Sequence, residues 1–216
     1  MAKTSNISRR RRSALAEGGE EYAAKRAELI EIAAGLFREK GYQSTRLADI
    51  ANAAGMDRAS IYYYIGSKEE LFRESVEGIL DMNLSEAKRI SKDPKLGIAD
   101  RLQQIFTVLM RSYEQNFPHM YVYIQEQMHQ VTTEETAWSQ EMLKKTRSFE
   151  AIITDLIREG AEAGELRNDI PPRLMTNALF GMFNWTHRWF TPGGSLSGEN
   201  VATAFNLLFW QGARAQ

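Results

Sequence analysis

The sequence predicts an all-α protein, with an N-terminal domain of three helices followed by a C-terminal helical bundle, about nine helices in all. Apolar residues recur every three or four positions in most segments, which is the spacing of one buried helix face. Gly and Pro residues separate these segments, and no segment alternates apolar and polar residues long enough to indicate a strand. The 216 residues are 43% hydrophobic, which is enough to form a buried core.

The composition and the motifs exclude several classes of protein. The chain has no Cys, which rules out disulfides and thiolate metal sites and suits a reducing cytoplasm. No apolar run approaches the roughly 18 residues of a transmembrane helix, and none follows the basic N-terminal stretch as in a secretory signal. The three His have no partners at metal-ligand spacing, and nucleophile-elbow, P-loop and dinucleotide motifs are absent. We therefore expect no metal, no cofactor, no catalytic residue and no membrane contact, and keep an enzyme only as an alternative.

Residues 1–19 are polar and contain the run Arg9–Arg12, which predicts a disordered basic arm. Such an arm either follows DNA phosphates or enters the minor groove, or it is a solvated tail without a specific role. Basic residues outnumber acidic ones up to Lys68 and acidic residues outnumber basic ones after it, although the net charge is only −1. This asymmetry fits DNA binding at one end of the molecule, or it arises by chance.

A first helix is expected from Glu20 to Lys40, ended by Gly41. After it, the stretch from Ser44 to Glu70 predicts two short helices joined by a tight turn, and the start of a third helix.

Each end in this stretch has a capping residue. Ser44 or Thr45 can cap the first short helix, and Gly55 suits the left-handed residue that ends it. Asp57 can cap the second helix, and Ser67 with Glu70 forms a capping box for the third. A helix, a Gly turn and a second helix within about 20 residues form the helix-turn-helix pattern, whose second helix lies in the DNA major groove. The alternative is an ordinary corner of a helical bundle.

The outward face of the second helix favours the DNA-binding interpretation. It carries a guanidinium and four hydroxyls, from Arg58, Ser60, Tyr62, Tyr63 and Tyr64. A solvated helix face more often carries Glu and Lys than three consecutive Tyr. Hydroxyls and a guanidinium suit phosphate oxygens and base edges.

This stretch resembles the DNA-binding signature of the TetR/AcrR family of bacterial regulators. The family pattern has an apolar residue after the turn Gly, a short polar run, Leu-Tyr, a variable residue, His-Phe and Ser-Lys-Glu. The corresponding residues here are Met56, Asp57 to Ser60, Ile61-Tyr62, Tyr63, Tyr64-Ile65 and Ser67-Lys68-Glu69, and the preceding helix matches at Asp49-Ile50-Ala51 and Ala53-Ala54-Gly55. Tyr64 stands where His is usual, which puts one phosphate contact in doubt, and Ile65 replaces Phe within the core.

The resemblance implies a set of DNA-binding residues and two domains. The DNA-binding set is Lys25, Arg26, Thr45, Arg46, Asp57, Arg58, Ala59, Ser60, Tyr62, Tyr63, Tyr64 and Lys68. The expected domains are a helix-turn-helix domain over residues 20–67 and an effector-binding and dimerisation domain over residues 68–216.

The C-terminal part is expected to be entirely helical. The expected helices cover residues 68–90, 98–116, 119–130, 134–163, 172–190 and 200–212, with the break between the first two at residues 93–97. Thr132 or Thr133 can cap the fourth of these helices, Gly164 can end it, and Ser197 can cap the last one.

The last two helices are dense in large apolar residues, more than one neighbouring helix can bury. Either the pair lies at the centre of the bundle, or part of it meets another chain. In the TetR family the last two helices form a twofold interface, and a paired DNA half-site needs a symmetric dimer. We therefore expect a homodimer whose interface includes Trp189, Phe205, Leu208, Phe209 and Trp210.

The middle helices are rich in aromatic residues and Met, which either form an ordinary core or line a cavity. Family members usually bind a small molecule there. The expected ligand-binding residues are Phe106, Met110, Tyr113, Tyr121, Met128, Trp138, Phe149, Phe183, Asn184 and His187. Asn184 and His187 lie one helical turn apart and would supply polarity in an apolar helix.

The segment from Gly181 to Gly194 resembles family members that control fatty-acid, steroid or aromatic-acid breakdown, some of which sense coenzyme A thioesters. Such a ligand needs an apolar tunnel that ends in basic residues. The position that would suit a basic residue, one turn before Trp185, is occupied by Gly181. The alternative basic residues are Lys144, Lys145, Arg147 and Arg188.

These observations predict a cytoplasmic, homodimeric repressor that binds a near-palindromic double-stranded DNA operator. A small apolar effector, such as an acyl compound or acyl-CoA, would release it through the helix at residues 68–90, which both parts share. The alternatives are a multidrug-sensing repressor of an efflux system and an effector-free DNA-binding protein.

Overall fold

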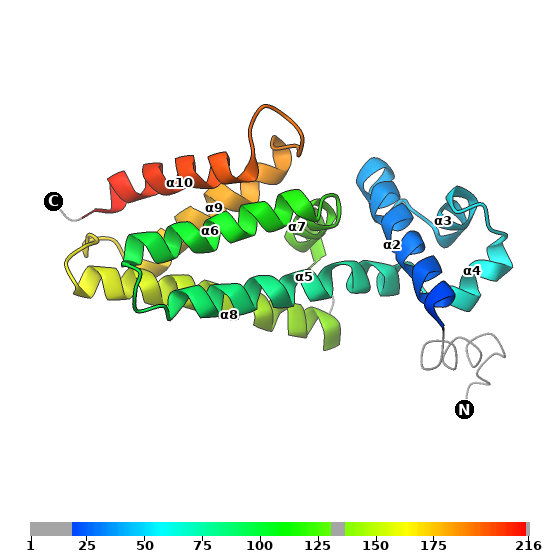
Figure 1. Cartoon of the computed structure of the whole chain (residues 1–216), viewed down its shortest axis with the longest axis horizontal. Coiled ribbons are helices and arrows are strands. Elements are labelled where there is room, and N and C mark those ends of the chain that lie inside the picture. Colours follow the sequence, from blue (N-terminus) through cyan, green and yellow to red (C-terminus); the bar gives the residue numbers. More distant parts are fainter. Residues whose placement is uncertain (1–18, 131–136, 215–216) are drawn as a thin grey trace. The chain divides into compact units, whose positions relative to one another are not determined.

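The computed structural model describes residues 19–130 and 137–214, without the side chains of residues 126–130, 137 and 139. Within these ranges every regular element is a helix, apart from one isolated bridge between Leu166 and Arg214. The all-α prediction is therefore confirmed (Figure 1). The expected basic arm at residues 1–19 and the expected cap at Thr132 or Thr133 fall, except for Gly19, outside the described residues. No helix in these ranges is long and apolar enough to cross a membrane.

The helices follow the predicted order closely. They are α2 (Glu20–Lys40), α3 (Leu47–Ala53), α4 (Arg58–Tyr64), α5 (Lys68–Ser91), α6 (Ile98–Gln115), α7 (His119–Gln130), α8 (Ala137–Glu162), α9 (Pro172–Asn184), the 3-10 helix η1 (Trp185–Arg188) and α10 (Gly198–Ala213).

The chain forms two compact units. The N-terminal unit holds the described residues up to Gly78 together with Pro118–Glu126, and the C-terminal unit holds Ile79–Phe117 and the described residues from Gln127 onwards. Helices α5 and α7 therefore each contribute residues to both units. The expected C-terminal domain included all of residues 119–130, whereas the start of α7 packs with the N-terminal helices.

In the N-terminal unit, α3 and α4 pack on α2 around buried residues that include Leu29, Ile50 and Ile61. The first turn of α7 docks on α2 through His119, whose Nε2 lies 3.0 Å from Oε1 of Glu31. The domain is small, so its buried side chains and the caps at the helix ends together hold α3 and α4 against α2.

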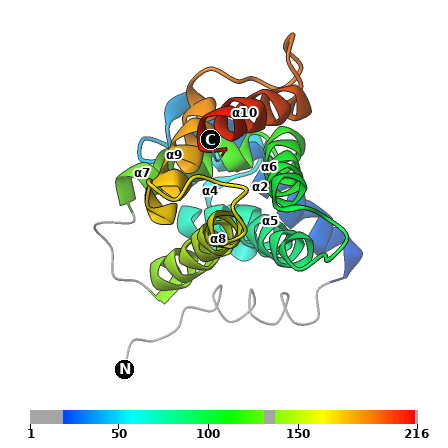
Figure 2. The ribbon, with the colours of Figure 1, turned by 90° about the vertical axis from the view of Figure 1, so that its left-hand side faces the viewer.

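In the C-terminal unit, α10 packs most closely on α6, and α8 packs on α9 (Figure 2). The core between these helices is aromatic, and the rings of Phe106 and Phe183 stack with centroids 4.1 Å apart. The backbones of α6 and α10 approach closely at Gly198, where an added Cβ would lie 2.7 Å from the carbonyl oxygen of Met110. The N–H of Gly198 also donates to the Glu114 carboxylate, 3.1 Å away, so α6 caps the start of α10.

Two helix ends differ from the sequence prediction. The N-cap of α3 is Arg46, which has extended backbone and whose N–H donates to the Asp49 carboxylate at 2.8 Å. Thr45 is buried and donates instead to the Gly41 carbonyl at 2.8 Å, which stabilises the end of α2. The helix expected to reach Phe190 ends at Asn184, where η1 tightens the backbone and buries His187.

Candidate functional site

The second helix of the helix-turn-helix, α4, is fixed at its start by Asp57. The Asp57 carboxylate accepts from the N–H groups of Ala59 and Ser60 at 2.8 and 3.0 Å, and from the Ser60 hydroxyl. These hydrogen bonds, with that of the Ser60 hydroxyl as the largest cause, lower the pKa of Asp57 below its ordinary value. The predicted cap is confirmed, and Gly55 before it has the expected left-handed φ of 65°.

The free face of α4 is polar and aromatic, as the sequence predicts. Arg58, Ala59, Ser60 and Tyr63 are exposed, and Arg58 makes no ion pair within the described part of the chain. Ile61 is fully buried on the opposite side. A short helix that presents an unpaired guanidinium and hydroxyl groups can donate hydrogen bonds to base edges and phosphates.

Arg26, expected from the family resemblance to meet DNA, has an internal role instead. Its side chain is only 7% exposed, and its Nη1 donates to the Tyr64 carbonyl at the end of α4. Its Nη2 donates to Glu74 and, at 3.3 Å, to Glu70. Burial alone would lower the pKa of Arg26, but the hydrogen bond and charge of Glu74 and the charge of Glu70 raise it. We call Arg26, the Tyr64 carbonyl, Glu70 and Glu74 the Arg26 network.

Lys68 is also engaged within the N-terminal unit. Its Nζ donates to the carbonyls of Tyr42, Gln43 and Thr45 at 2.8, 3.2 and 3.2 Å, and lies 4.5 Å from the centroid of the Tyr42 ring. All three ammonium protons are used by the loop before α3. Lys68 therefore fixes that loop to the start of α5.

The remaining residues of the expected DNA-binding set differ in exposure and in the contacts that they make within the protein. Lys25 is half-buried and its Nζ pairs with Glu28 at 2.8 Å, whereas Arg46 is exposed at the start of α3. Tyr62 is half-buried, and Tyr64 stacks on Tyr22 of α2 with centroids 5.1 Å apart.

Three residues with structural roles here were missed by sequence reasoning, namely Tyr22, Glu70 as a partner of Arg26, and Glu74. A signal existed in part, because Tyr22 and Arg26 lie four residues apart on one face of a helix and Glu70 and Glu74 do the same. Nothing in the sequence says that these two faces meet.

The residues expected to bind an effector are mostly packed together in the C-terminal unit. Phe106, Met110, Tyr113, Phe149 and Phe183 are buried, and Trp138 is half-buried. Asn184 is exposed, Tyr121 belongs to the N-terminal unit, and the side chain of Met128 lies outside the description.

His187 is buried in η1, and its Nδ1 lies 2.6 Å from the Asn184 carbonyl. The two residues that were expected to supply polarity are therefore in contact through the backbone of one and the ring of the other.

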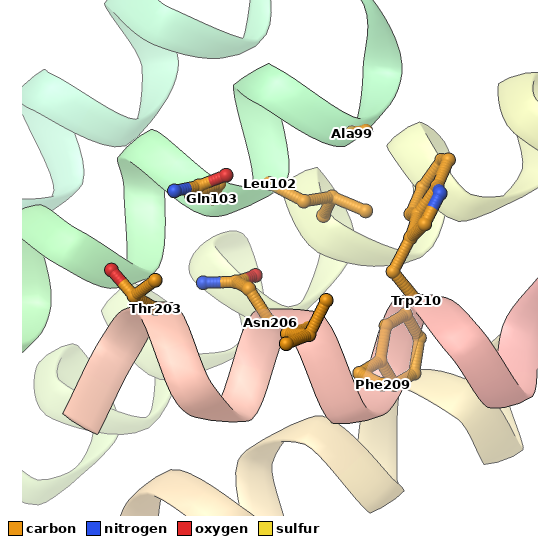
Figure 3. Close-up of a pocket in the computed structure, with 8 residues that line it drawn as sticks. Ala99, Leu102, Gln103, Thr203, Asn206, Phe209 and Trp210 are labelled. Atoms are coloured by element: carbon orange, nitrogen blue, oxygen red, sulfur yellow. The ribbon is translucent and has the colours of Figure 1, made fainter. Parts of the chain in front are cut away.

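A pocket of about 210 Å³ opens between α6 and α10 (Figure 3). Gln103, Thr203 and Asn206 gather at one end of it, and Phe209 and Trp210 at the other. Leu102, Ala99 and Leu207 complete the lining, so no charged side chain faces the pocket. The expected effector-binding residues do not line this pocket, whereas two expected interface residues do.

The candidate basic residues lie at the surface of the C-terminal unit. Lys144, Arg147 and Arg188 are exposed, and the Arg188 guanidinium lies 5.3 Å from the Trp185 ring centroid. Lys145 is paired with Asp81 of α5 at 2.7 Å. None of the described residues form a cluster of three or more His, Cys, Asp or Glu side chains suited to a metal ion.

Five exposed large apolar side chains, which we call the apolar strip, come from α9, from η1 and the residue after it, and from α10. Its members are Leu174, Trp185, Trp189, Leu207 and Leu208, with exposed fractions between 47% and 62%. Among the expected interface residues, Trp189 and Leu208 belong to this strip, Phe209 and Trp210 are half-buried, and Phe205 packs inward on Phe183 with ring centroids 5.3 Å apart.

Two family profiles match this chain. The profile described as bacterial regulatory proteins, tetR family, matches residues 29–75, and that described as tetracyclin repressor-like, C-terminal domain, matches residues 95–213.

Among curated proteins, the HTH-type transcriptional repressor KstR2 of Mycobacterium tuberculosis is 28% identical over 182 residues, which is 84% of this chain and 89% of that protein.

Many solved structures share the fold, including the following two. The ketosteroid transcriptional regulator KstR2 of Mycobacterium tuberculosis superposes with a TM-score of 0.79 at 24% identity, covering 89% of this chain and 96% of that one. AibR in complex with isovaleryl coenzyme A and operator DNA superposes with a TM-score of 0.69 at 20% identity, covering 88% and 97%.

Proposed function

The chain belongs to the TetR family of bacterial regulatory proteins, and from this premise we propose that it is a cytoplasmic, homodimeric repressor that a small apolar effector releases from its operator. The proposed domains are residues 20–67 for DNA binding and residues 68–216 for effector binding and dimerisation. The single observation that carries the DNA-binding role is the exposed face of α4, where Arg58 has no ion-pair partner among the described residues.

In this proposal α4 reads bases and its flanks hold phosphates. Arg58, Ser60, Tyr62 and Tyr63 face the major groove, while Arg46 and Lys25 lie where they can meet the backbone. Arg26, Thr45 and Lys68 contribute by holding α2, α3 and α4 in place, since their donors are already used within the unit.

The first test is a footprint of the purified protein on the DNA upstream of its own coding sequence. A TetR-type repressor protects a near-palindromic site there, with a Kd of roughly 10⁻⁸ M or tighter at physiological salt. Protection of no site, with only salt-sensitive binding to any DNA, would contradict an operator-specific role.

The exposed apolar strip supports the dimer. Five large apolar side chains from this part of the chain are each between 47% and 62% exposed, and exposed apolar side chains in such number often mark a protein–protein interface. A twofold axis through α9 and α10 would bury the strip against its copy and produce the symmetric pair of α4 helices that a palindromic operator requires.

Leu208→Glu tests this arrangement. Leu208 is 62% exposed, so the change leaves the protomer folded but places two charges in the proposed interface. Sedimentation at micromolar concentration should show monomers that no longer bind the operator. Met82→Glu is the matched control, because Met82 is 60% exposed on α5 away from the strip and should stay dimeric. A dimeric Leu208→Glu would place the interface elsewhere.

For the effector we propose an acyl compound or its coenzyme A thioester, bound among α6, α8 and α9. The supporting observations are the aromatic cluster of Phe106, Phe149, Phe180 and Phe183, whose rings must separate to admit a ligand, and the resemblance of residues 181–194 to catabolic regulators. The relative KstR2 is a ketosteroid transcriptional regulator, and AibR, which shares the fold, has been solved in complex with isovaleryl coenzyme A. Steroid acids and acyl thioesters are therefore the first compounds to try.

The other end of such a site would be formed by basic residues. Lys145 is occupied by Asp81, so the exposed Arg188, Lys144 and Arg147 are the groups that would meet the phosphates of a thioester.

A thermal-shift screen tests the effector class. It compares fatty, aromatic and steroid acids with their coenzyme A thioesters, and uses coenzyme A alone as the control. A stabilising acid or thioester that also weakens operator binding supports the proposal. If no compound shifts the unfolding temperature, the effector-free DNA-binding protein becomes the better account, and a shift only with unrelated cationic drugs favours a multidrug sensor.

The route between the two functions would be α5, which contributes residues to both units. An effector that binds only one position of α5 biases the equilibrium between DNA-binding and released forms.

A further inference from the structure

The Arg26 network connects the end of the DNA-reading helix to the start of α5. Helix α4 has seven residues, too few to be stable by themselves, so its direction depends on contacts made from outside. Its last carbonyls receive those contacts from α2. Arg26 donates to the Tyr64 carbonyl, and the Tyr22 hydroxyl donates to the carbonyls of Tyr63 and Tyr64 at 3.3 and 3.5 Å.

The other side of the Arg26 guanidinium is held by α5. Glu70 and Glu74 lie on the first two turns of α5, and both carboxylates accept from Nη2. The second oxygen of Glu70 accepts from the Gly66 N–H at 3.0 Å, in the link between α4 and α5. One planar group therefore contacts α4 and α5 at once, while belonging to α2.

The geometry of a guanidinium makes this connection rigid. Its five donors lie in one plane, so a shift of the two carboxylates must either move the Tyr64 carbonyl or break a hydrogen bond. The Arg26 side chain is 7% exposed, so a broken bond would leave a buried charge without its partner, which is strongly unfavourable. Displacement of the first turns of α5 is therefore passed on to the end of α4.

We propose that Arg26 is a positioning residue for operator recognition, which sets the direction of α4 from the first two turns of α5, and that Glu74 acts through it. This inference rests on the proposed DNA-binding function. A phosphate contact by Arg26 would not involve Glu74. The positioning role, in contrast, makes operator affinity depend on Glu74, whose negative charge gives it no reason to touch DNA.

Glu74→Gln distinguishes positioning from charge. Removal of a negative charge by itself strengthens DNA binding. If Glu74 positions α4 through Arg26, the variant instead binds the operator about tenfold more weakly, comparable to the loss of one base contact. Its affinity for non-specific DNA of the same length should stay equal to that of the wild type or rise slightly.

Glu77→Gln is the matched control. Glu77 lies three residues further along α5, loses the same charge, and makes no ion pair within the described ranges. It should bind operator and non-specific DNA as the wild type does or slightly more tightly. If Glu74→Gln and Glu77→Gln bind the operator alike, the proposal is overturned.

A double-mutant cycle with Arg26→Gln adds a second criterion. Residues of one network give a double variant, Arg26→Gln with Glu74→Gln, that binds the operator no more weakly than Arg26→Gln alone. Losses that add up would contradict the proposal. So would an Arg26→Gln variant that loses operator and non-specific affinity equally and lowers the salt slope by about 1, since this is the behaviour of a phosphate contact.

Hydrogen exchange without DNA separates this inference from the proposed function. Peptides that cover residues 58–66 should exchange faster in Arg26→Gln and Glu74→Gln than in Glu77→Gln or the wild type, with peptides of α6 unchanged. Unchanged exchange over residues 58–66 would overturn the positioning role. A wild-type protein that protects no DNA, together with the expected exchange pattern, would remove the operator function and leave the Arg26 network intact.

Discussion

Each of the two units is stabilised internally by a different kind of interaction. In the N-terminal unit, polar side chains bind the free ends of short helices. Asp57 caps α4, Lys68 binds three loop carbonyls and Arg26 binds the last carbonyl of α4. In the C-terminal unit, aromatic rings such as Phe106 and Phe183 stack between long helices. We infer that hydrogen-bond geometry fixes the positions of the short helices in the small N-terminal domain. In the bundle, the fit of buried side chains mainly fixes the positions of the helices.

The largest effect is expected from Phe106→Ala in the bundle. Phe106 is fully buried and contacts Phe180 and Phe183, so the truncation should lower the free energy of unfolding by about 3–5 kcal/mol. Urea denaturation measures it, and Phe106→Leu, which removes less volume, should cost less than Phe106→Ala. A loss below about 1 kcal/mol for Phe106→Ala would mean that the ring lines an open cavity instead of a packed core.

A smaller effect is expected from Gly198→Ala, at the close approach of α10 to α6. The new Cβ would meet the backbone of Met110, so we expect a loss of about 1–3 kcal/mol of stability. Gly212→Ala in the same helix has no atom within 4 Å of its Cβ and should be neutral or stabilising. Equal unfolding midpoints for the two variants would show that α10 does not pack this tightly.

The smallest effect on stability is expected at Asp57. Its dependence on pH would distinguish the N-terminal unit, with its charged cap, from the C-terminal unit, with its apolar core. The pKa of Asp57 is lowered in the folded state, so its contribution to stability is present above the unfolded pKa of about 4. It is lost as the pH falls through the lowered folded-state value. Asp57→Asn keeps an acceptor oxygen for the cap but removes the charge, so thermal unfolding measured from pH 7 down to pH 3 should show a weaker pH dependence. An unchanged profile would contradict this role.

The same difference explains what the sequence predicted well. Caps are local, and therefore Gly55, Asp57, Ser67 and Ser197 marked helix ends that the structure confirms. The end of α9 was missed because residues 185–188 keep the apolar pattern of a helix while their backbone tightens into η1.

Contacts between distant segments could not be predicted in this way. Arg26 was expected to contact DNA because the family geometry would bring the start of the first helix near a phosphate, and only the folded structure brings Glu70 and Glu74 to it. Likewise, the apolar spacing of Phe106, Phe149 and Phe183 is the same for a packed core and for a ligand cavity. The pocket lined by Gln103, Thr203 and Asn206 has no sequence pattern at all, since it depends on the register between α6 and α10.

The central claim is that α4 reads DNA through its exposed face, and Arg58→Ala tests it most directly. The measurement compares wild type and variant on the protected operator and on a set of single-base substitutions, at one salt concentration. We predict that the variant loses about 1–3 kcal/mol of operator affinity and its preference at one base position, while non-specific affinity changes little. Operator affinity and base preference equal to those of the wild type would contradict the account.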